Sequence, residues 1–357
     1  MSTKERVLVA MSGGVDSSLA AALLHEQGYD VVGVTLHLWD AQGDSKVGRC
    51  CAPEDRDDAR RTCELLGVPH YVLDERDEFR KHVVDAFIAD NLKGITPSPC
   101  VHCNQHVKLG RLVQIADRLG ARQIATGHYA RIARDPAGAP LLLRGRDRKK
   151  DQSYFLFGLP ETLLDRLVFP LGELEKDDAR LEAKRLGLPN WNKPDSQELC
   201  FVPDGNVAGF VKQQSPSDAG AGEGGKIVDS EGRTLGEHAG IEGFTVGQRR
   251  GIRVPGPAPR YVLRVLPESR EVVVGDDAQL LGAELEATGA SWSAVLDPAP
   301  IRAEVRIRYR HEPAPATVVP SERGFSVRFD EPQRAIAPGQ AVVVYRGEQV
   351  LGGGFIV

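Results

Sequence analysis

The stretch VLVAMSGGVDSS at residues 7–18 decides the fold of the first part of this chain. The apolar run Val7 to Ala10 predicts a short buried strand, and the apolar-periodic residues after the stretch predict a helix. Gly13 and Gly14 lie between the two, where glycine lets the backbone adopt positive φ and approach a ligand closely. Serine hydroxyls at 12, 17 and 18 stand beside the open N–H groups of the helix start. The stretch therefore predicts a strand, an anion-binding loop and a helix.

This loop differs from the longer Gly-x-x-x-x-Gly-Lys-Ser/Thr nucleotide loop. It lacks the lysine that binds β- and γ-phosphates, and Asp16 stands where a cation could be held. These differences favour binding of pyrophosphate over transfer of a γ-phosphoryl group. The alternative is an ordinary Gly/Ser turn between a strand and a helix. The loop resembles the PP-loop, Ser-Gly-Gly-x-Asp-Ser, of the ATP pyrophosphatase superfamily, which implies adenylation of a carbonyl oxygen and release of pyrophosphate.

Length and composition place the chain among globular proteins of more than one domain. Its 357 residues suit two or three domains, and 41% of them are hydrophobic and 27% charged. We find no run of about 18 apolar residues and no basic-then-apolar leader, and we expect a cytoplasmic protein with no membrane contact. No large exposed apolar helix face is evident, which favours a monomer. The net charge of −5 means that contacts with nucleic acid would come from local patches.

Predicted strands and helices alternate from residue 1 to about 205. The strands, all expected to be buried, are 7–10, 31–36, 71–73 and 123–125, and the helices are 17–27, 55–66, 77–92 and 104–119. This alternation predicts an α/β domain at 1–205, with a parallel sheet covered on both faces and ligand sites at the carboxyl ends of its strands.

Glycine-rich segments and short alternating runs replace the helical periods after Pro203. We expect a small central β domain at 206–285, with strands at 261–266 and 271–274. A C-terminal β domain at 286–357 has predicted strands near 301–310, 324–329 and 341–346. Its pattern is that of a small barrel or sandwich, and we expect a barrel.

The six cysteines, at 50, 51, 63, 100, 103 and 200, are scattered, which is typical of thiols in a reducing compartment. Cys100 and Cys103 lie just before the predicted helix 104–119, where the helix dipole favours thiolate, so Cys103 is a candidate nucleophile. If Cys200 faces Cys103 in the fold, the two could form a persulfide and then a disulfide, and so deliver one sulfur atom.

Three alternatives remain open for these cysteines. A zinc site needs a fourth ligand, for which His102 or a distant cysteine could serve. An iron–sulfur cluster could be held by Cys100, Cys103 and Cys200 with one iron open. Some of the cysteines could simply be buried small residues, an interpretation that suits Cys63 within its helix and is open for residues 50 and 51.

Several motifs in order along the chain resemble the tRNA-specific 2-thiouridylase family. The likeness covers nearly the whole chain, and its motifs are the loop at 12–17, Cys103-Asn104, 125–129 (ATGHY), 150–155 (KDQSYF), Cys200-Phe201, 247–251 (GQRRG), 306–309 and 351–354 (LGGG). The resemblance implies that ATP activates the C2 oxygen of the wobble uridine in certain tRNAs and that sulfur then replaces it. It implies Cys103 as the nucleophile and Cys200 as the persulfide carrier. Many relatives have aspartate where this chain has Cys100, which keeps a [4Fe-4S] cluster open as a cofactor.

The resemblance also implies where ATP binds. The residues are Ala10, Met11, Ser12, Gly13, Gly14, Val15, Asp16 and Ser17, with Leu36 and Gly127 at the ends of two further strands. Strand ends are where ligands bind in open sheets. Magnesium, which Asp16 could reach, would neutralise charge as pyrophosphate leaves.

RNA contacts are expected first at the basic stretch 144–150, the most basic of the chain. The resemblance implies tRNA contacts at Lys150, Asp151, Gln152, Arg308, Tyr309 and Gln340, contacts with the target base at Ser98, Pro99 and Cys100, and an RNA contact at His128. On the predicted strand 301–310, arginines at 302, 306, 308 and 310 would share one face. The anticodon arm of tRNA is the expected target, because its single-stranded loop lets the wobble base leave the stack.

The expected partners are tRNA and a persulfide-donating sulfur carrier or cysteine desulfurase. One rival function is an ATP-dependent amidating ligase of the same superfamily, although no N-terminal cysteine glutaminase signature appears and such a ligase would not use Cys103 and Cys200. The other is a noncatalytic tRNA-binding protein that retains a nucleotide fold, against which the intact loop at 12–17 argues.

Overall fold

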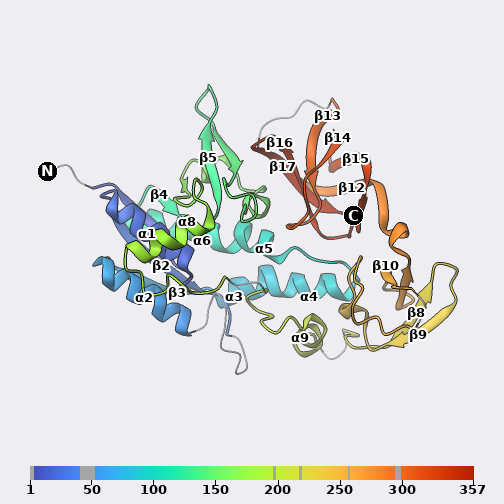
Figure 1. The fold of residues 1–357 in the computed structure, drawn as a ribbon. Coiled ribbons are helices and arrows are strands. Elements are labelled where there is room, and N and C mark those ends of the chain that lie inside the picture. The colour runs from blue at the N-terminus through green and yellow to red at the C-terminus, as the bar shows by residue number, and fades with distance from the viewer. Residues whose placement is uncertain (1–3, 41–52, 196–197, 217–218, 256–257, 294–298) are drawn as a thin grey trace. The chain divides into compact units, whose positions relative to one another are not determined.

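The computed structural model describes residues 4–40, 53–195, 198–216, 219–255, 258–293 and 299–357. The chain divides into two compact units (Figure 1). The first unit comprises residues 1–82, 100–205 and 348–350. The second unit comprises residues 83–99, 206–347 and 351–357. Residues 50 and 51, whose role the sequence left open, lie outside the described residues.

A parallel sheet forms the centre of the first unit, as the alternating pattern predicted. Its strands run in the order β3 (His70–Asp74), β2 (Asp30–His37), β1 (Arg6–Ala10), β4 (Gln123–Ala125) and β7 (Leu167–Val168). Residues 7–9 of β1 are fully buried because β2 and β4 flank the strand. The carboxyl ends of β1 and β4 therefore lie side by side, with the chain leaving β1 into the glycine loop.

Helix α1 (Val15–Glu26) is enclosed on two sides, which explains why most of it is apolar. Ala20, Ala21 and Leu24 pack with the sheet and α2 (Pro53–Leu66). Val15, Leu19 and Ala22 pack instead with α8 (Lys176–Arg185). This packing on two sides fixes the N-terminus of α1 close to the carboxyl end of β1.

Strand β3 departs from the expectation that residues 71–73 are buried. Tyr71 and Val72 are each about half exposed, at 48% and 49% of their surface. β3 is the last strand of the sheet on that side among the described residues, so that its apolar side chains are not covered as those of β1 are. Hydrophobicity alone does not distinguish an edge strand from a central one.

Two helices predicted as continuous contain π-helical turns. The run predicted at 77–92 consists of α3 (Arg76–Phe79), the π segment η1 (Arg80–Val84) and α4 (Asp85–Leu92). The run predicted at 104–119 begins earlier, as α5 (Pro99–His102), the π segment η2 (Cys103–Lys108) and α6 (Leu109–Leu119). Proline suits the first helical position, which explains the early start at Pro99. The prediction that both thiols precede the helix is therefore wrong, because Cys100 and Cys103 lie within the helical run.

A hairpin of β5 (Ala130–Arg134) and β6 (Pro140–Arg144) follows the sheet edge, and Gln349 pairs with Leu143 of β6 within the same unit. Two short helices, η3 (Ser153–Phe155) and α7 (Glu161–Leu164), lead from it to β7. The basic stretch 144–150 thus begins at the end of a strand and continues as a loop.

The second unit contains a small sheet in the order β10 (Tyr261–Leu266), β11 (Glu271–Gly275), β8 (Gly225–Asp229) and β9 (Thr234–His238). Ile227, Val262 and Val274 are among its core residues. Helix α9 (Val207–Gln214) contacts α4 through Phe210 and Phe87, and the short helix η4 (Ile241–Gly243) lies between β9 and β10 in the chain. The two strands predicted in this part are present at the expected residues.

The second unit also contains a closed barrel, as predicted. Its strands are β12 (Leu281–Trp292), β13 (Ile301–Arg306), β14 (Ala314–Pro320), β15 (Gly324–Arg334), β16 (Ala341–Arg346) and β17 (Gln349–Ile356), and the 3₁₀ turn η5 (Asp277–Leu280) precedes it. Pairing of β12 with both β15 and β17 closes it.

The strand predicted at 301–310 ends at Arg306, which corrects the expected row of four RNA-facing arginines. Arg306 is buried with its guanidinium 5.4 Å from the ring centroid of Tyr309, and Arg302 pairs with Asp330.

Candidate active site

The glycine loop joins β1 to α1 in a conformation that requires glycine at one position. Gly13 has φ of +75°, and a Cβ there would lie 2.0 Å from the carbonyl oxygen of Asp55. Ser17 Oγ accepts a hydrogen bond from Ser12 N at 3.1 Å and donates to the Gly14 carbonyl at 3.1 Å. Because the N-cap of α1 is Gly14, no side chain caps the first N–H groups of the helix. The loop thus presents open backbone donors at the positive end of the helix dipole.

The end of β4 lies directly against this loop. A Cβ on Gly127 would lie 2.7 Å from the Ser17 nitrogen and from the Asp16 carbonyl carbon. Thr126 Oγ1 and His128 Nδ1 are 2.8 Å apart. Leu36 lies in β2, on the other side of β1. The structure therefore places the residues expected to bind the nucleotide along neighbouring strand ends.

Asp16 forms an ion pair that sequence reasoning did not foresee. Lys176, at the start of α8, donates from Nζ to both carboxylate oxygens of Asp16 at 2.7 and 2.8 Å, and the Tyr129 hydroxyl donates to one of them at 3.0 Å. The side chain of Lys176 is only 8% exposed. Burial, and then the negative charge of Asp16, raise the pKa of Tyr129, so the hydroxyl keeps its proton.

Asp195 continues this network toward the basic stretch. Its carboxylate accepts from Lys176 at 3.0 Å, from Lys150 at 2.6 Å and from Arg180 at 2.9 Å. Burial opposes ionisation of Asp195, but the hydrogen bonds from Lys150 and Lys176 outweigh it and hold its pKa at about 2. A chain of alternating charges thus joins the glycine loop to the residues expected to contact tRNA.

The other side of the loop is held by residues 190–193. Asn190 Nδ2 donates to the Gly13 carbonyl at 3.0 Å, and Lys193 Nζ donates to the same oxygen at 3.1 Å. Lys193 also pairs with Asp55 at 2.5 Å and Asp58 at 2.6 Å. Burial opposes the charge of Lys193, but these carboxylates raise its pKa overall. The loop is therefore fixed before any ligand arrives.

Lys176, Asn190 and Lys193 were missed by sequence reasoning. Each lies more than 150 residues from the loop in the chain, and none carries a local motif. The sequence indicated them only weakly. The mostly polar stretch 190–195 follows the end of a helix in an α/β domain, and the loops of such a domain include those that lie at the ligand-binding edge of the sheet.

The segments that contain Cys103 and Cys200 both pack against the helical run of α3 and η1. Cys103 is 5% exposed at the start of η2, which packs against α3. Cys200 is half-buried, and the next residue, Phe201, makes an edge contact with Phe79 of α3, the ring centroids being 5.7 Å apart. Both segments thus meet the same short helix. Cys100 is exposed.

Three histidines form a stack that includes two residues close to Cys103 in the chain, His102 and His106. The ring of His106 stacks on those of His82 and His102, with both centroid distances 6.0 Å. Burial lowers the pKa of His102 and of His106, and in each case a neighbouring histidine adds to the effect. The imidazoles of His102 and His106 therefore favour the neutral form and can accept a proton. Sequence reasoning assigned His102 only a possible role in zinc binding.

Cys63 is a buried core residue, as its helical position suggested. Burial, with a smaller effect of Glu64, raises the pKa of its thiol to about 11.

In the part of the chain that the structure describes, no three His, Cys, Asp or Glu side chains are grouped so that they could hold a metal ion. Cys100, Cys103 and Cys200 as placed do not supply a cluster's ligand set. Asp16, expected near magnesium, has both oxygens on Lys176.

The residues expected to contact tRNA in the first unit have unequal roles. Asp151 is buried and accepts hydrogen bonds from the nitrogens of Gly145 and Ser153 at 3.0 and 3.1 Å. Gln152 Oε1 accepts from Tyr129 N at 3.0 Å. Asp151 and Gln152 therefore hold the loop in shape, whereas Arg146, Arg148 and Lys149 are exposed.

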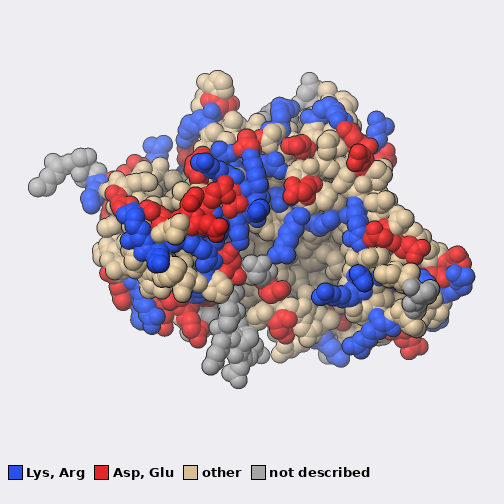
Figure 2. All heavy atoms as spheres, viewed as in Figure 1, with Lys and Arg blue, Asp and Glu red and all other residues tan. Residues whose placement is uncertain are grey.

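A basic cavity of about 540 Å³ lies beside this loop. Its basic lining residues are Arg146, Arg148, Lys149, Lys150, Lys176 and Arg180, and its acidic ones are Asp147, Glu175, Asp177 and Asp195. Figure 2 shows Lys and Arg side chains interleaved with Asp and Glu in the region of α8. Burial, with a smaller effect of Lys108, lowers the pKa of nearby His128 to about 3, so this imidazole is neutral.

The remaining expected contacts lie in the second unit, apart from Cys100. Ser98 Oγ accepts from Ala341 N at 2.9 Å, and Gln340 Nε2 donates to the carbonyls of Thr96 and Pro97 at 3.2 and 3.1 Å. Arg308 donates to the Arg334 carbonyl at 2.9 Å. The segment before Pro99 is thus fastened to the start of β16, and Ser98 and Gln340 meet there.

Among the described residues, no helix combines the length and apolarity that crossing a bilayer requires.

Family models match three parts of the chain: a "tRNA methyl transferase HUP domain" at residues 5–204, a "tRNA methyl transferase PRC-barrel domain" at 210–276 and an "Aminomethyltransferase beta-barrel domain" at 283–356. A solved structure described as a predicted subunit of tRNA methyltransferase from Methanocaldococcus jannaschii is 22% identical, with a TM-score of 0.32, over 50% of this chain and 74% of that one.

Curated relatives match over the full length. The tRNA-specific 2-thiouridylase MnmA of Sorangium cellulosum is 51% identical over 99% of this chain and 93% of its own length. The protein of the same name from Geobacter metallireducens is 47% identical over 99% of this chain and 97% of its own. The parallel sheet with its glycine loop, the small β domain and the closed barrel agree with this match, and the chain belongs to the tRNA-specific 2-thiouridylase family.

Proposed function

We propose that this protein is an ATP-dependent enzyme that replaces the C2 oxygen of the wobble uridine of tRNA by sulfur. The proposal rests mainly on one observation. The N-terminus of α1 has no side-chain cap, and Asp16 in its first turn forms an ion pair with the buried Lys176. A phosphate-binding loop with a buried cation beside it suits a reaction that activates an oxygen with ATP and releases pyrophosphate.

In the first step the triphosphate binds to the loop 12–17 with the nucleotide across the ends of β1, β2 and β4. Lys176 is held by two carboxylates, and an arriving phosphate at the α1 N-terminus offers a third anion within reach of its Nζ. Lys176 then stabilises the charge that grows on the departing pyrophosphate. The C2 oxygen of the uridine attacks the α-phosphorus, and pyrophosphate leaves. Magnesium bound to the ATP phosphates would add positive charge there.

In the second step sulfur displaces AMP. The terminal sulfur of a Cys200 persulfide attacks C2, the C2–O bond breaks, and AMP takes the electron pair. The Cys103 thiolate then attacks Cys200 Sγ, which forms a disulfide and leaves the sulfur on the base. In the alternative order, Cys103 releases hydrosulfide from the persulfide first, and hydrosulfide attacks C2. Either order ends in the same disulfide, which a thiol reductant must reopen.

Packing of both cysteine segments against α3 and η1 supports this pairing. His102 and His106 are close to Cys103 in the chain, and burial favours their neutral form, so that either imidazole would be able to take up a thiol proton if it reached Cys103. The persulfide sulfur would come from a cysteine desulfurase or a sulfur carrier. We propose that the chain has three domains, at residues 1–205, 206–285 and 286–357.

The test compares Cys103→Ser and Cys200→Ser with Cys63→Ala, a control that removes a thiol buried in the core beneath the sheet. We expect both serine variants to lose 2-thiouridine formation, measured by mass spectrometry of digested tRNA, and to retain tRNA-dependent pyrophosphate release. Unimpaired thiolation in both would refute the thiol mechanism. Incorporation of ammonia in place of sulfur would favour an amidating ligase, and binding of tRNA without pyrophosphate release would indicate a noncatalytic protein.

A further inference from the structure

The segment from Gly247 to Arg260 in the second unit is basic and carries no acidic residue. It contains four arginines, at positions 249, 250, 253 and 260. The first three are exposed and Arg260 is half-buried. Within the described residues none of the four has an ion pair, whereas Arg233 and Arg302 of the same unit pair with Asp229 and Asp330 at 2.7 and 2.6 Å. The charge of this segment is therefore available to an external anion.

Residues 247–253 of this segment are held firmly although they form neither helix nor strand. Ile252 is 4% exposed and packs in the core of the small sheet with Val262. Two backbone hydrogen bonds fasten the loop to the start of β10, from Gly247 N to the Val262 carbonyl at 2.8 Å and from Val262 N to the Gln248 carbonyl at 2.9 Å. The arginines on either side of Ile252 are thus displayed from a fixed backbone.

Arg253 has φ of +53°, in the left-handed region that side chains rarely adopt. Such a conformation costs about 1–2 kcal/mol relative to the right-handed one. Glycine would remove this cost, as it does at Gly247 and Gly251, where φ is +86° and +84°. An arginine at this position therefore adds a charge at the expense of stability.

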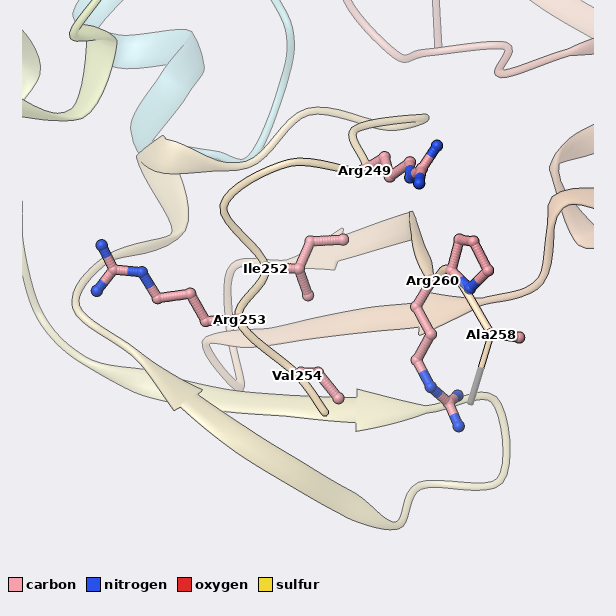
Figure 3. A pocket seen from close by; sticks show the side chains of 7 residues that line it. Arg249, Ile252, Arg253, Val254, Ala258 and Arg260 are labelled. Carbon is pink, nitrogen blue, oxygen red and sulfur yellow. The ribbon is translucent and has the colours of Figure 1, made fainter. Parts of the chain in front are cut away.

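Arg249, Arg253 and Arg260 line a cavity of about 300 Å³, and none of the described residues around it is acidic. Figure 3 shows the guanidinium groups of Arg249, Arg253 and Arg260 pointing in different directions around it. One small anion cannot contact all three groups. An extended polyanion with regularly spaced charges can, and the phosphates of a nucleic acid backbone have this property.

We propose that Arg249, Arg253 and Arg260 form a surface that binds the sugar–phosphate backbone of tRNA without reading its sequence. This inference rests on the proposed function, because it takes tRNA as the polyanion. It assigns RNA binding to the central β domain, in addition to the contacts expected at 150–152 and in the barrel.

The test is a triple variant, Arg249→Gln, Arg253→Asn and Arg260→Gln. Asparagine is chosen at 253 because it tolerates positive φ. The affinity for unmodified tRNA is measured between 50 and 200 mM KCl, together with thiolation at saturating tRNA. We expect affinity about ten-fold weaker at 150 mM, and a slope of log K against log salt about 2–3 units shallower, since each lost phosphate contact removes about 0.7–0.9. The maximal rate should be unchanged.

A matched control replaces two paired arginines, Arg233→Gln and Arg302→Gln, and should leave the slope as in the unaltered protein. An unchanged slope in the triple variant would overturn the inference. So would saturable binding of inorganic phosphate that the triple variant loses while its tRNA affinity persists, because the arginines would then form a small-anion site. If the unaltered protein thiolates tRNA and the triple variant binds it normally, only this inference fails. If the unaltered protein neither binds nor thiolates tRNA, the proposed function fails as well.

Discussion

Replacing Lys176 by methionine tests the central electrostatic element of the site. The side chain keeps its length and loses the charge that Asp16 and Asp195 share. Removing one partner of a fully buried ion pair costs about 3–5 kcal/mol. Here Asp16 is 32% exposed and Asp195 keeps Lys150 and Arg180, so the expected loss of folding free energy is smaller, about 1–3 kcal/mol. For a domain of this size it lowers Tm by roughly 2–10 °C.

The effect on activity should exceed the effect on stability. If Lys176 stabilises the departing pyrophosphate, its loss should lower the rate of tRNA-dependent pyrophosphate release about 10²–10³-fold, as removal of a single charge-stabilising donor does elsewhere. The assay is pyrophosphate release at saturating ATP and tRNA, at a temperature well below the Tm of the variant. Lys184→Met is the control, because Lys184 lies on the same helix and contacts Trp191 instead of the loop.

A rate within about three-fold of that of the unaltered protein, in a folded Lys176→Met variant, would refute the reasoning. The ion pair with Asp16 would then serve stability alone. A double variant that also carries Asp16→Asn separates the two roles, since it removes the uncompensated carboxylate and should recover part of the lost stability without recovering the rate.

Three further outcomes follow from the geometry of the first unit. Gly127→Ala places a methyl group 2.7 Å from the backbone of α1 and should weaken ATP binding and lower Tm, whereas Gly14→Ala, with negative φ and its nearest atom at 3.6 Å, should leave Tm nearly unchanged; equal Tm values would contradict this account. His128 stays neutral in the folded state down to a pKa of about 3, so protonation of the unfolded chain should reduce stability as pH falls below about 6.5, and urea titrations should show a smaller loss for His128→Gln. Asp151→Ala removes the acceptor of two backbone hydrogen bonds, so it should cost about 1–3 kcal/mol and weaken tRNA binding by loosening the basic loop, as measured by urea unfolding and by tRNA titration; unchanged values would show that these two hydrogen bonds do not hold the loop.

Local pattern was sufficient for much of the fold. β4 was predicted at its observed residues, and β1 to within one, because a short apolar run between glycine-rich turns has few alternatives in an α/β domain. The exposure of β3 was not predictable, since strand order in a sheet is a long-range property. The strand that ends at Arg306 was predicted too long. The alternation of polar and apolar residues continues past it and does not reveal that the buried Arg306 side chain lies over the ring of Tyr309.

The candidate site was predictable only where one short segment carries it. The glycine loop and the cysteines were visible as motifs, whereas Lys176 and Lys193 become meaningful only when the fold brings them to Asp16 and Asp55. An isolated lysine in a charged helix is most often a solvated residue, so nothing in the chain distinguished these two. Both owe their importance to burial beside carboxylates that are distant in sequence.

The wide turn η2, which begins at Cys103, contains one more residue per turn than an ordinary helix. Deleting a single residue between 104 and 108 would restore regular winding. Because the wide turn spreads its additional residue over nearly the same rotation, Cys103 would then keep close to its present direction relative to α6. A regular helix that retained every residue would instead rotate Cys103 by about 100° around the axis relative to α6. The direction of the Cys103 side chain thus depends on the width of this turn as well as on the spacing between Cys103 and α6.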